Sequence, residues 1–600
     1  MKTAIRLVPL QAFALAVLAS TAAAVTVTRG PYLQTPTPHG IVVRWRTDVP
    51  TDSRVRTGAA PGSLATIIDD PTPTTEHVVT LGGLAPDTDY YYSVGSAGGA
   101  LLGDDPAYRL RTFPLPGPAR PTRIWAIGDA GFAGPELDAV RNAYASFTGS
   151  TPTDLWLLLG DNAYLVGSDA NYQAAVFDPH RDLLRRVAPW PTFGNHEGFS
   201  SNALTGVGPY FNMFTLPTAG EAGGVPSGTE SYYSFDFANV HVVVLDGNSS
   251  STVAGSPMRT WLDADLSATT ADWVIAMWHQ PPYSKGQFHD SDVETREILM
   301  RQNVLPVLDA HGVDLVLNGH SHSYERSHLL DGFYGTAVPP APSMVLDGGD
   351  GRVGSDGPYR KATIGPAPHE GAVYVVAGSS SETRPITAGH PAMEIGLSEL
   401  GSLVVDVNGD TLAGTFLQAN GVLGDTFRIV KGHGGPTSPC TAAPVAGCVQ
   451  STKASLMLRK NAIASRDGLA WKWKGAAVPP GAVGNPPGQD FAICVYDASG
   501  RKAGGRLAPG AAWSVRNGDF TYHDKYGVFG PMGRARIMVG AASRAQITAS
   551  GKGAGLGLVT ASSTAPLRAQ LVNLDAGGCW ESTFPTIVRQ TPSRLQARQP

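Results

Sequence analysis

The chain has 600 residues, more than one domain usually contains, which favours two to four domains. Its formal net charge is only -5, so the sequence carries no overall basic footprint of the kind that nucleic-acid-binding proteins show. The 71 glycines and 16% charged residues favour a loop-rich extracellular protein with much β structure.

The first 24 residues are typical of a secretory signal peptide. Lys2 and Arg6 precede an apolar stretch from Leu7 to Ala19, and small residues follow up to Ala24, where cleavage is expected. The alternative is an uncleaved membrane anchor, but the apolar stretch is shorter than the ~20 residues that span a bilayer. We therefore expect a secreted or extracytoplasmic protein, periplasmic or extracellular, without a membrane span.

Residues 25–115 are predicted to form an N-terminal β-sandwich. Alternating segments such as 40–47 are separated by clusters of Pro, Gly and Asp. The segment 84–94 resembles the tyrosine corner of a fibronectin type III sandwich. Residues 114–118, with three prolines, are expected to form a stiff linker to the next domain.

Residues 118–430 alternate apolar runs with helical patterns, which predicts α/β layering around buried strands. The expected strands cover 124–127, 155–159, 240–245, 273–277, 315–317, 403–407 and 411–417, and the expected helices cover 136–147, 172–187 and 293–310. Residues 333–395 are rich in Gly, Pro and Ser, so we expect surface loops there around one strand at 372–377.

Five short motifs in this region carry side chains that bind metals. They are Gly128-Asp129-Ala130-Gly131, Gly160-Asp161-Asn162-Ala163-Tyr164, Gly194-Asn195-His196-Glu197, Trp278-His279 and Gly319-His320-Ser321-His322. Each alone has a structural explanation, such as a shaped loop or a core histidine. Because each comes just after an apolar run, we expect all five to meet where strands end. Together they predict a site for two cations about 4 Å apart.

The donor types narrow the choice of metal. Asp161 can use both carboxylate oxygens and is the natural bridge between two ions. Tyr164 can ligate as a phenolate, although free tyrosine has a pKa of about 10. A phenolate at ordinary pH needs a strong Lewis acid, and ferric iron is the obvious candidate.

The end of the chain is predicted to hold a linker at 431–449 and a small β-rich, disulfide-containing domain at 450–592. Trp471 and Trp473 fit either one packed face of a sheet, which we favour, or a sugar-binding platform. The polar tail beyond Pro592 is expected to be disordered.

All four cysteines lie beyond the proposed catalytic region, and two disulfides have three possible connectivities. We favour Cys440 with Cys448, because they share the linker, which leaves Cys494 with Cys579.

The motif set resembles that of the purple acid phosphatases, which are members of the calcineurin-like metallophosphoesterases. The family signature is Asp, Gly-Asp-x-x-Tyr, Gly-Asn-His-Glu/Asp, His and Gly-His-x-His. Related enzymes without a bound tyrosine usually begin with Asp-x-His, but here Asp129-Ala130-Gly131 lacks that histidine and Tyr164 is present. The resemblance covers 118–430 and the preceding sandwich, and it implies a central α-β-β-α sandwich.

The resemblance also implies the role of each residue. One ion, Fe(III), is expected to be held by Asp129, Asp161, Tyr164 and His322, and a divalent Zn, Mn or Fe by Asp161, Asn195, His279 and His320. The implied reaction is direct hydrolysis by attack of a metal-bound hydroxide. His196 matches the histidine that hydrogen-bonds the phosphate. His289 lies where plant members have a histidine proposed to protonate the leaving group, although it also fits a solvated loop histidine.

Three functions remain open. The leading prediction is a secreted acid phosphatase that hydrolyses small phosphomonoesters. The second is a phosphodiesterase or nucleotide pyrophosphatase that uses the same metals, because the substrate-selecting loops near 199–230 and 333–395 cannot be interpreted. The third is a surface-binding protein in which the C-terminal domain dominates and binds a surface or a polysaccharide. No nucleic acid is expected as a specific partner.

Overall fold

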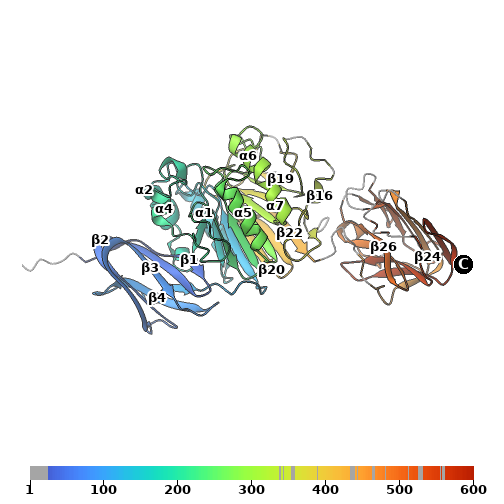
Figure 1. Ribbon diagram of the computed structural model, residues 1–600, viewed down its shortest axis with the longest axis horizontal. Helices are drawn as coiled ribbons and strands as arrows, with labels where there is room; N and C mark the ends of the chain where they lie inside the picture. The colour runs from blue at the N-terminus through green and yellow to red at the C-terminus, as the bar shows by residue number, and fades with distance from the viewer. Residues whose placement is uncertain are drawn as a thin grey trace, which may run out of the picture.

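The computed structural model describes residues 24–599 with short gaps. The gaps are 337–338, 342, 353–357, 388, 433–439, 442, 462–465, 480, 511, 525–530, 554–555, 557 and 559–560. The predicted signal peptide therefore falls almost wholly outside the described residues. Within them, no helix has the length and apolarity that a bilayer span requires. Figure 1 shows three units in chain order, with the central one between the other two.

The N-terminal unit consists of antiparallel strands. They are β1 (Val27–Thr37), β2 (Gly40–Gly58), β3 (Thr66–Gly82), β4 (Asp89–Ser96), β5 (Gly99–Gly103) and β6 (Arg109–Arg111). The long strand β2 pairs with β1, β3 and β4. The Tyr90 hydroxyl accepts a hydrogen bond from the backbone N–H of Ala85 (2.9 Å), which is the contact expected of a tyrosine corner.

The central unit contains two seven-stranded sheets. The first has the order β17 (Tyr359–Lys361), β22 (Leu423–Lys431), β21 (Thr411–Gln418), β20 (Gly401–Asn408), β7 (Thr122–Ile127), β8 (Leu155–Leu158) and β9 (Pro189–Pro191). The second has the order β10 (Tyr233–Phe237), β11 (Val240–Val244), β12 (Trp273–Met277), β13 (Leu315–Asn318), β18 (Val373–Ala377), β14 (Tyr324–Ser327) and β19 (Met393–Leu397). Strands β7, β8 and β9 are mutually parallel, as are β11, β12, β13 and β18.

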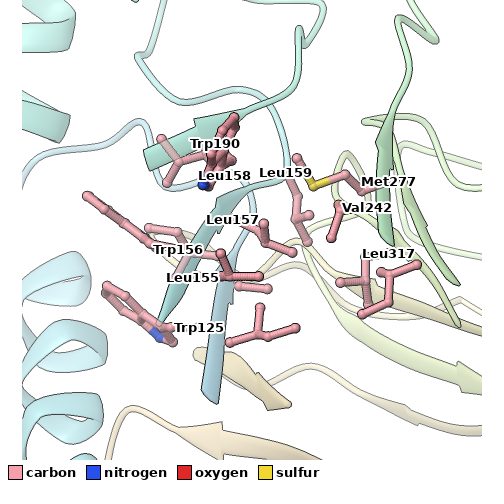
Figure 2. Close-up of a cluster of buried hydrophobic side chains, with 14 of the residues drawn as sticks. Trp125, Leu155, Trp156, Leu157, Leu158, Leu159, Trp190, Val242, Met277 and Leu317 are labelled. Atoms are coloured by element: carbon pink, nitrogen blue, oxygen red, sulfur yellow. The ribbon is translucent and has the colours of Figure 1, made fainter. Parts of the chain in front are cut away.

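One apolar core is shared by both sheets. Figure 2 shows Leu157 and Leu159 beside Val242, Met277 and Leu317 of the second sheet, and all five are buried. The burial of strands on both faces explains why they read as continuous apolar runs rather than as alternating ones.

Helices cover the outer faces of the two sheets. On the first sheet, Tyr144 of α1 (Pro135–Thr148) stacks on Trp125 with ring centroids 4.3 Å apart. On the second, α5 (Pro257–Ala268), α6 (Thr295–Asn303) and α7 (Leu305–His311) share a separate buried cluster with Val243, Val274 and Val316.

Two expected helices are broken. The segment 172–187 is divided into α2 (Asp169–Tyr172), a π-helical turn (Gln173–Phe177) and α3 (Arg181–Leu184), and Pro179 lies at the break. The segment 293–310 is divided between α6 and α7, and Pro306 lies in the first turn of the second helix.

The region 333–395 contains the expected buried strand β18, but also three other strand segments. They are β16 (Val345–Asp347), β17 and β19. Of these, β16 pairs with β15 (Leu329–Leu330). The short helix α4 (Pro209–Met213) and further loops complete the central unit.

The C-terminal unit is a twelve-stranded β structure. Its main path is β26 (Gly500–Leu507), β25 (Phe491–Asp497), β31 (Leu567–Asn573), β32 (Cys579–Phe584), β23 (Val449–Arg459), β24 (Gly468–Gly475), β30 (Gln546–Lys552), β29 (Met532–Met538), β28 (Asp519–His523) and β27 (Trp513–Arg516). Trp471 and Trp473 are buried in its core, so they pack the sheet and do not form a sugar-binding platform.

The predicted disorder beyond Pro592 is wrong. Residues Arg594–Gln599 form β34, which pairs with β23 and with β33 (Ile587–Thr591). Leu595 and Ala597 are buried in the core, and the alternate residues Arg594, Gln596 and Arg598 are on the outer face. The polarity of the tail reflects a half-buried strand.

The favoured disulfide pairing is also wrong. Cys440 bonds to Cys494, and Cys448 bonds to Cys579. The reason is that Cys440 packs on β25, whereas Cys448 packs against β31 and β32. The two cysteines of the linker are thus held by different strands, although they are close in sequence.

Candidate metal centre

The predicted ligands lie just beyond the carboxyl ends of parallel strands from both central sheets. Asp129 follows β7, Asp161 follows β8 and Asn195 follows β9 in the first sheet. In the second sheet His279 follows β12, and His320 and His322 follow β13. Tyr164 is on the loop that begins at Asp161. Strand ends are where α/β sheets position ligand-binding side chains, and here two sheets contribute to one site.

Three of these residues have a left-handed backbone conformation. The φ angles are 53° at Asp129, 50° at Asp161 and 69° at His320. Residues other than glycine rarely adopt this conformation, and it persists only where the surroundings enforce it. The fold therefore fixes the direction in which each of these three side chains leaves its strand.

The glycines of the motifs allow the ligand loops to approach closely. A Cβ at Gly160, which has a φ of +90°, would lie 2.5 Å from Nδ1 of His279. A Cβ at Gly194 would lie 2.2 Å from Oδ1 of Asp161. Both distances are too short for a real contact, so these positions require glycine.

Asp129, Tyr164 and His322 form one group of donors. The Tyr164 hydroxyl donates to Oδ1 of Asp129 (3.0 Å) and lies 3.1 Å from Nε2 of His322. His322 Nε2 is 3.4 Å from the same Asp129 oxygen. Burial and the neighbouring carboxylates of Asp129 and Asp161 raise the pKa of Tyr164 well above 10. The phenol therefore ionises only if a strong positive charge is bound beside it.

Asn195, His279 and His320 form a second group. Nε2 of His279 lies 3.0 Å from Oδ1 of Asn195 and 3.2 Å from Nδ1 of His320. It also lies 3.3 Å from Oδ1 of Asp161. Ligand atoms of Asp161, His279 and His320 are all within 4.8 Å of one another, and all three residues are buried. Asp161 thus adjoins the second group, and its charge also acts on Tyr164 of the first group.

Electrostatics at the centre favour bound cations. Burial lowers the pKa of His279, but the carboxylates of Asp161 and Asp129 outweigh it and raise this pKa to about 10. Burial alone would raise the pKa of Asp161, but His279 and His196 lower it below its ordinary value of 3.8. The buried carboxylates thus attract positive charge to the position that Nε2 of His279 faces. A metal ion can supply that charge in place of a proton.

Two of the three imidazoles donate a hydrogen bond on their outer side, and the third lies near a carboxylate. His279 donates from Nδ1 to the carbonyl of Leu159 (2.8 Å). His320 donates from Nε2 to Glu294 (3.0 Å), and Nδ1 of His322 is 3.4 Å from Glu382. Metal-bound histidines usually make such contacts, which fix the tautomer and leave the other nitrogen free for the metal. The donor set therefore fits a metal centre.

Glu294 and Glu382 adjoin the site, although neither was predicted from the sequence. Glu294 lies fifteen positions after His279 in a segment without a motif, and Glu382 follows β18, so only the fold brings them to the imidazoles. Their carboxylates are the partners of His320 and His322.

Glu197 holds the ligand loops together from behind. Its buried carboxylate accepts hydrogen bonds from the backbone N–H groups of Asp161 (2.9 Å), Asn162 (2.9 Å) and Gly194 (2.8 Å). The hydroxyl of Tyr172 donates to it as well (3.2 Å). Glu197 belongs to the motif Gly194-Asn195-His196-Glu197, but its role was not predicted. It is a positioning residue that joins the loop after β8 to the loop after β9.

His196 and His289 lie on the accessible side of the donor groups. His196 donates from Nδ1 to the carbonyl of Leu165 (2.6 Å), and its Nε2 is 3.7 Å from Oδ2 of Asp161. His289 packs on His320 with ring centroids 3.8 Å apart, and its Nδ1 is 2.7 Å from Glu294. Their side chains are 28% and 27% exposed, so both could reach a molecule bound at the centre.

Comparison with known families agrees with this geometry. Residues 122–324 match the calcineurin-like phosphoesterase family, and residues 30–112 match the N-terminal domain of purple acid phosphatases. All seven predicted ligands fall inside the first match. The chain is thus similar to calcineurin-like phosphoesterases over much of its central unit and to purple acid phosphatases over its N-terminal unit. The C-terminal unit lies outside both matches.

Individual proteins show the same likeness. Purple acid phosphatase 18 of Arabidopsis thaliana is 30% identical over 282 residues, which cover 46% of this chain and 58% of that protein. Purple acid phosphatase 15 of the same plant is 28% identical over 300 residues, covering 46% and 53%. An uncharacterised protein of Mycobacterium tuberculosis is 30% identical over 287 residues, covering 43% and 51%. The chain thus spans little more than half the length of these relatives.

A purple acid phosphatase from yellow lupin (Lupinus luteus) seeds has a similar fold. The TM-score is 0.53 at 17% sequence identity, and the alignment covers 67% of this chain and 75% of the lupin chain. At this identity the likeness concerns the fold alone.

Proposed function

We propose that this chain hydrolyses phosphomonoesters at a two-metal centre carried by an α-β-β-α sandwich. Support comes chiefly from the three imidazoles. His279 and His320 are each held by an outer acceptor, His322 lies near Glu382, and the other nitrogen of each ring lies among the buried donors. Ferric iron would be held by Asp129, Asp161, Tyr164 and His322. A divalent zinc, manganese or iron ion would be held by Asp161, Asn195, His279 and His320.

The metals would supply Lewis acidity, which lowers the pKa of bound water and offsets the charge of a phosphate. The protein supplies the placement of the donors. Left-handed backbone at Asp129, Asp161 and His320, together with the contacts of Glu197, holds the ligand loops in position before any substrate arrives. Such preorganisation reduces the rearrangement needed at the moment of reaction.

His196 and His289 have separate roles in this proposal. With Nδ1 bound to the Leu165 carbonyl, a doubly protonated His196 presents an N–H at Nε2 to a phosphate oxygen. His289 is held by Glu294 through Nδ1, so its Nε2 is the nitrogen that can pass a proton to the leaving oxygen. Replacement of His289 by Gln should therefore slow the hydrolysis of esters with poor leaving groups, such as alkyl phosphates, more than the hydrolysis of 4-nitrophenyl phosphate. Equal slowing of both substrates would contradict the acid role.

The metal assignment is tested by metal analysis and the visible spectrum of the purified protein. We expect iron, and a tyrosinate-to-iron charge-transfer band that disappears in Tyr164→Phe. Exchange of Asn195 for Ala should reduce the content of the divalent ion and leave that band in place. A colourless but active manganese enzyme would refute the role of Tyr164.

The class of substrate is tested by a monoester and a diester with the same leaving group. A higher kcat/KM for the monoester is expected, and a higher value for the diester would favour the phosphodiesterase alternative.

We also propose an extracytoplasmic location, because both disulfides of the C-terminal unit need an oxidising environment. Localisation of the protein in fractionated cells of its source checks this.

A further inference from the structure

Charge is divided unequally between the C-terminal unit and the rest of the chain. From residue 449 to the end there are 19 Lys and Arg against seven Asp and Glu, whereas residues 1–448 contain 26 and 43. The modest net charge of the whole chain therefore hides a strongly basic unit. Such asymmetry points to an acidic partner.

The acidic side chains of this unit neutralise only part of its positive charge, because they pair with just six of its cations among the described residues: Lys460, Lys502, Arg506, Arg536, Arg544 and Arg568. Six of the seven, Asp467, Asp490, Asp497, Asp519, Asp524 and Glu581, are buried. The seventh, Asp575, forms an ion pair of 2.6 Å with Arg360 of the central unit. The exposed charge of the C-terminal unit is therefore almost entirely positive.

The cations gather on the outward face of the sheet formed by β34, β23, β24, β30, β29 and β28, which we term the basic face. Residues paired across antiparallel strands share a face. One row across it runs Arg598, Ser455, Lys472, Thr548, Arg536 and Thr521. Cations alternate with hydroxyl groups along this row, so that they recur at every second strand, about 10 Å apart.

Neighbouring rows extend the same pattern. Lys453 pairs with Lys474 in one, and Ser550, Arg534 and His523 follow one another in the next. The middle of the basic face is hollowed by a groove of about 530 Å³. Its polar lining is formed by Thr521, His523, Arg534, Arg536, Thr548 and Ser550, and Ala470, Trp471, Tyr522, Ala535 and Ala549 also line it. Among the residues that the structure describes, Lys453, Lys472, Lys474, Arg534 and Arg598 form no ion pair within 4.0 Å.

The other side chains of this face narrow the choice of partner. Among the described residues of the C-terminal unit no Phe, Tyr or Trp side chain is exposed, and His523 is the one exposed aromatic ring, which leaves little surface for stacking nucleic-acid bases. The exposed large apolar residues described in this unit are Val449, Val515 and Val588, too few to insert into a lipid surface. Hydroxyl groups between the cations suit a polymer that carries both carboxylates or sulfates and hydroxyls.

We propose that the basic face binds a linear acidic polysaccharide, which lies in the groove across the strands. This inference does not depend on the phosphatase activity. The basic face and the metal centre share no residues, because the cations of the basic face are on strands that begin after residue 448.

The test is binding of the full-length protein to polygalacturonate at low salt, with neutral dextran as the control polymer. The variant is Lys472→Gln with Arg534→Gln on the basic face. The matched control is Arg501→Gln with Lys502→Gln on β26, in the opposite half of the unit, and it removes the same charge. Hydrolysis of a small monoester is measured for all three proteins.

We expect the wild type to bind polygalacturonate but not dextran, and to bind at least tenfold more weakly when salt is raised from 25 to 250 mM, roughly as screening of surface charge requires. The basic-face variant should bind about tenfold more weakly at low salt, since two exposed charge contacts are lost. The control variant should change by less than about twofold, and hydrolysis should be unchanged in both.

Three results would overturn the proposal. The first is no binding to polygalacturonate at low salt. The second is an equal loss in both variants, which would indicate diffuse attraction without a defined face. The third is tighter binding to duplex DNA or to phosphatidylserine vesicles than to the polysaccharide. Inactivity toward the monoester with retained polymer binding would instead reject the proposed enzyme and leave this inference intact.

Discussion

Replacement of Glu197 by Gln tests whether one buried carboxylate holds the metal-binding loops in place. Oε2 accepts the backbone N–H groups of Asp161 and Gly194, and Oε1 accepts that of Asn162. A glutamine presents only one oxygen, so at least one of these buried N–H groups would face an amide NH₂. An unsatisfied buried donor costs about 1–3 kcal/mol. We expect the free energy of unfolding of the central unit to fall by about 2 kcal/mol.

Calorimetry should show this as a decrease in the Tm of the central unit of about 4 °C. Metal content should also fall, because the loops of Asp161 and Asn195 are no longer tied together. Tyr172→Phe is the matched control, since it removes only the hydroxyl contact of 3.2 Å and leaves all three backbone bonds. If Glu197→Gln keeps the Tm and the metal of the wild type, the proposed positioning role is wrong.

Three further predictions concern other parts of the molecule. Burial lowers the pKa of His241, but its hydrogen bonds to Asp236 and Asp265 outweigh this and raise it from 6.5 to about 9. The charged ring therefore stabilises the fold fully below pH 6.5, and up to about 3 kcal/mol of the free energy of unfolding is lost as the pH rises through 9. Urea unfolding at several pH values should show this loss, and the free energy of unfolding should depend less steeply on pH in Asp236→Asn. Gly160→Ala should abolish metal retention, because the new Cβ collides with a metal-facing imidazole; normal metal content would show that the loops can adjust. Cys448→Ser opens a bridge that spans 131 residues and should destabilise the C-terminal unit by about 2–5 kcal/mol while monoester turnover persists; loss of turnover in the folded protein would mean that the units are coupled.

Much of the central unit could be predicted from the sequence because its signals are local. Buried parallel strands produce short apolar runs, and each metal-binding motif lies just after one of them, as at Ile127 and Asp129. The glycines of the motifs mark the places where loops approach closely. The expectation that these loops meet depends only on the general property that parallel strands end at one edge of a sheet.

The errors concern contacts between residues far apart in sequence. The positions of four cysteines in the sequence do not show which strands will lie against each other. The predicted bond between Cys440 and Cys448 rested on their closeness in sequence and was therefore wrong. Glu294 and Glu382 orient histidines through loops that carry no motif. The tail after Pro592 looked disordered because its apolar residues, Leu595 and Ala597, are few, although the core of the C-terminal unit buries both.

The two disulfides determine how the C-terminal unit resists a pulling force. Cys440 and Cys448 flank the entry of the chain into this unit, and they are bonded to β25 and β32 respectively. A force applied through the preceding chain is therefore carried by covalent bonds into the interior of the β structure, and β23 cannot be peeled away one hydrogen bond at a time. If the basic face is attached to a polymer while the central unit is moved by flow, the junction between them would hold as long as the bridges remain oxidised. A reducing environment would act as a mechanical release.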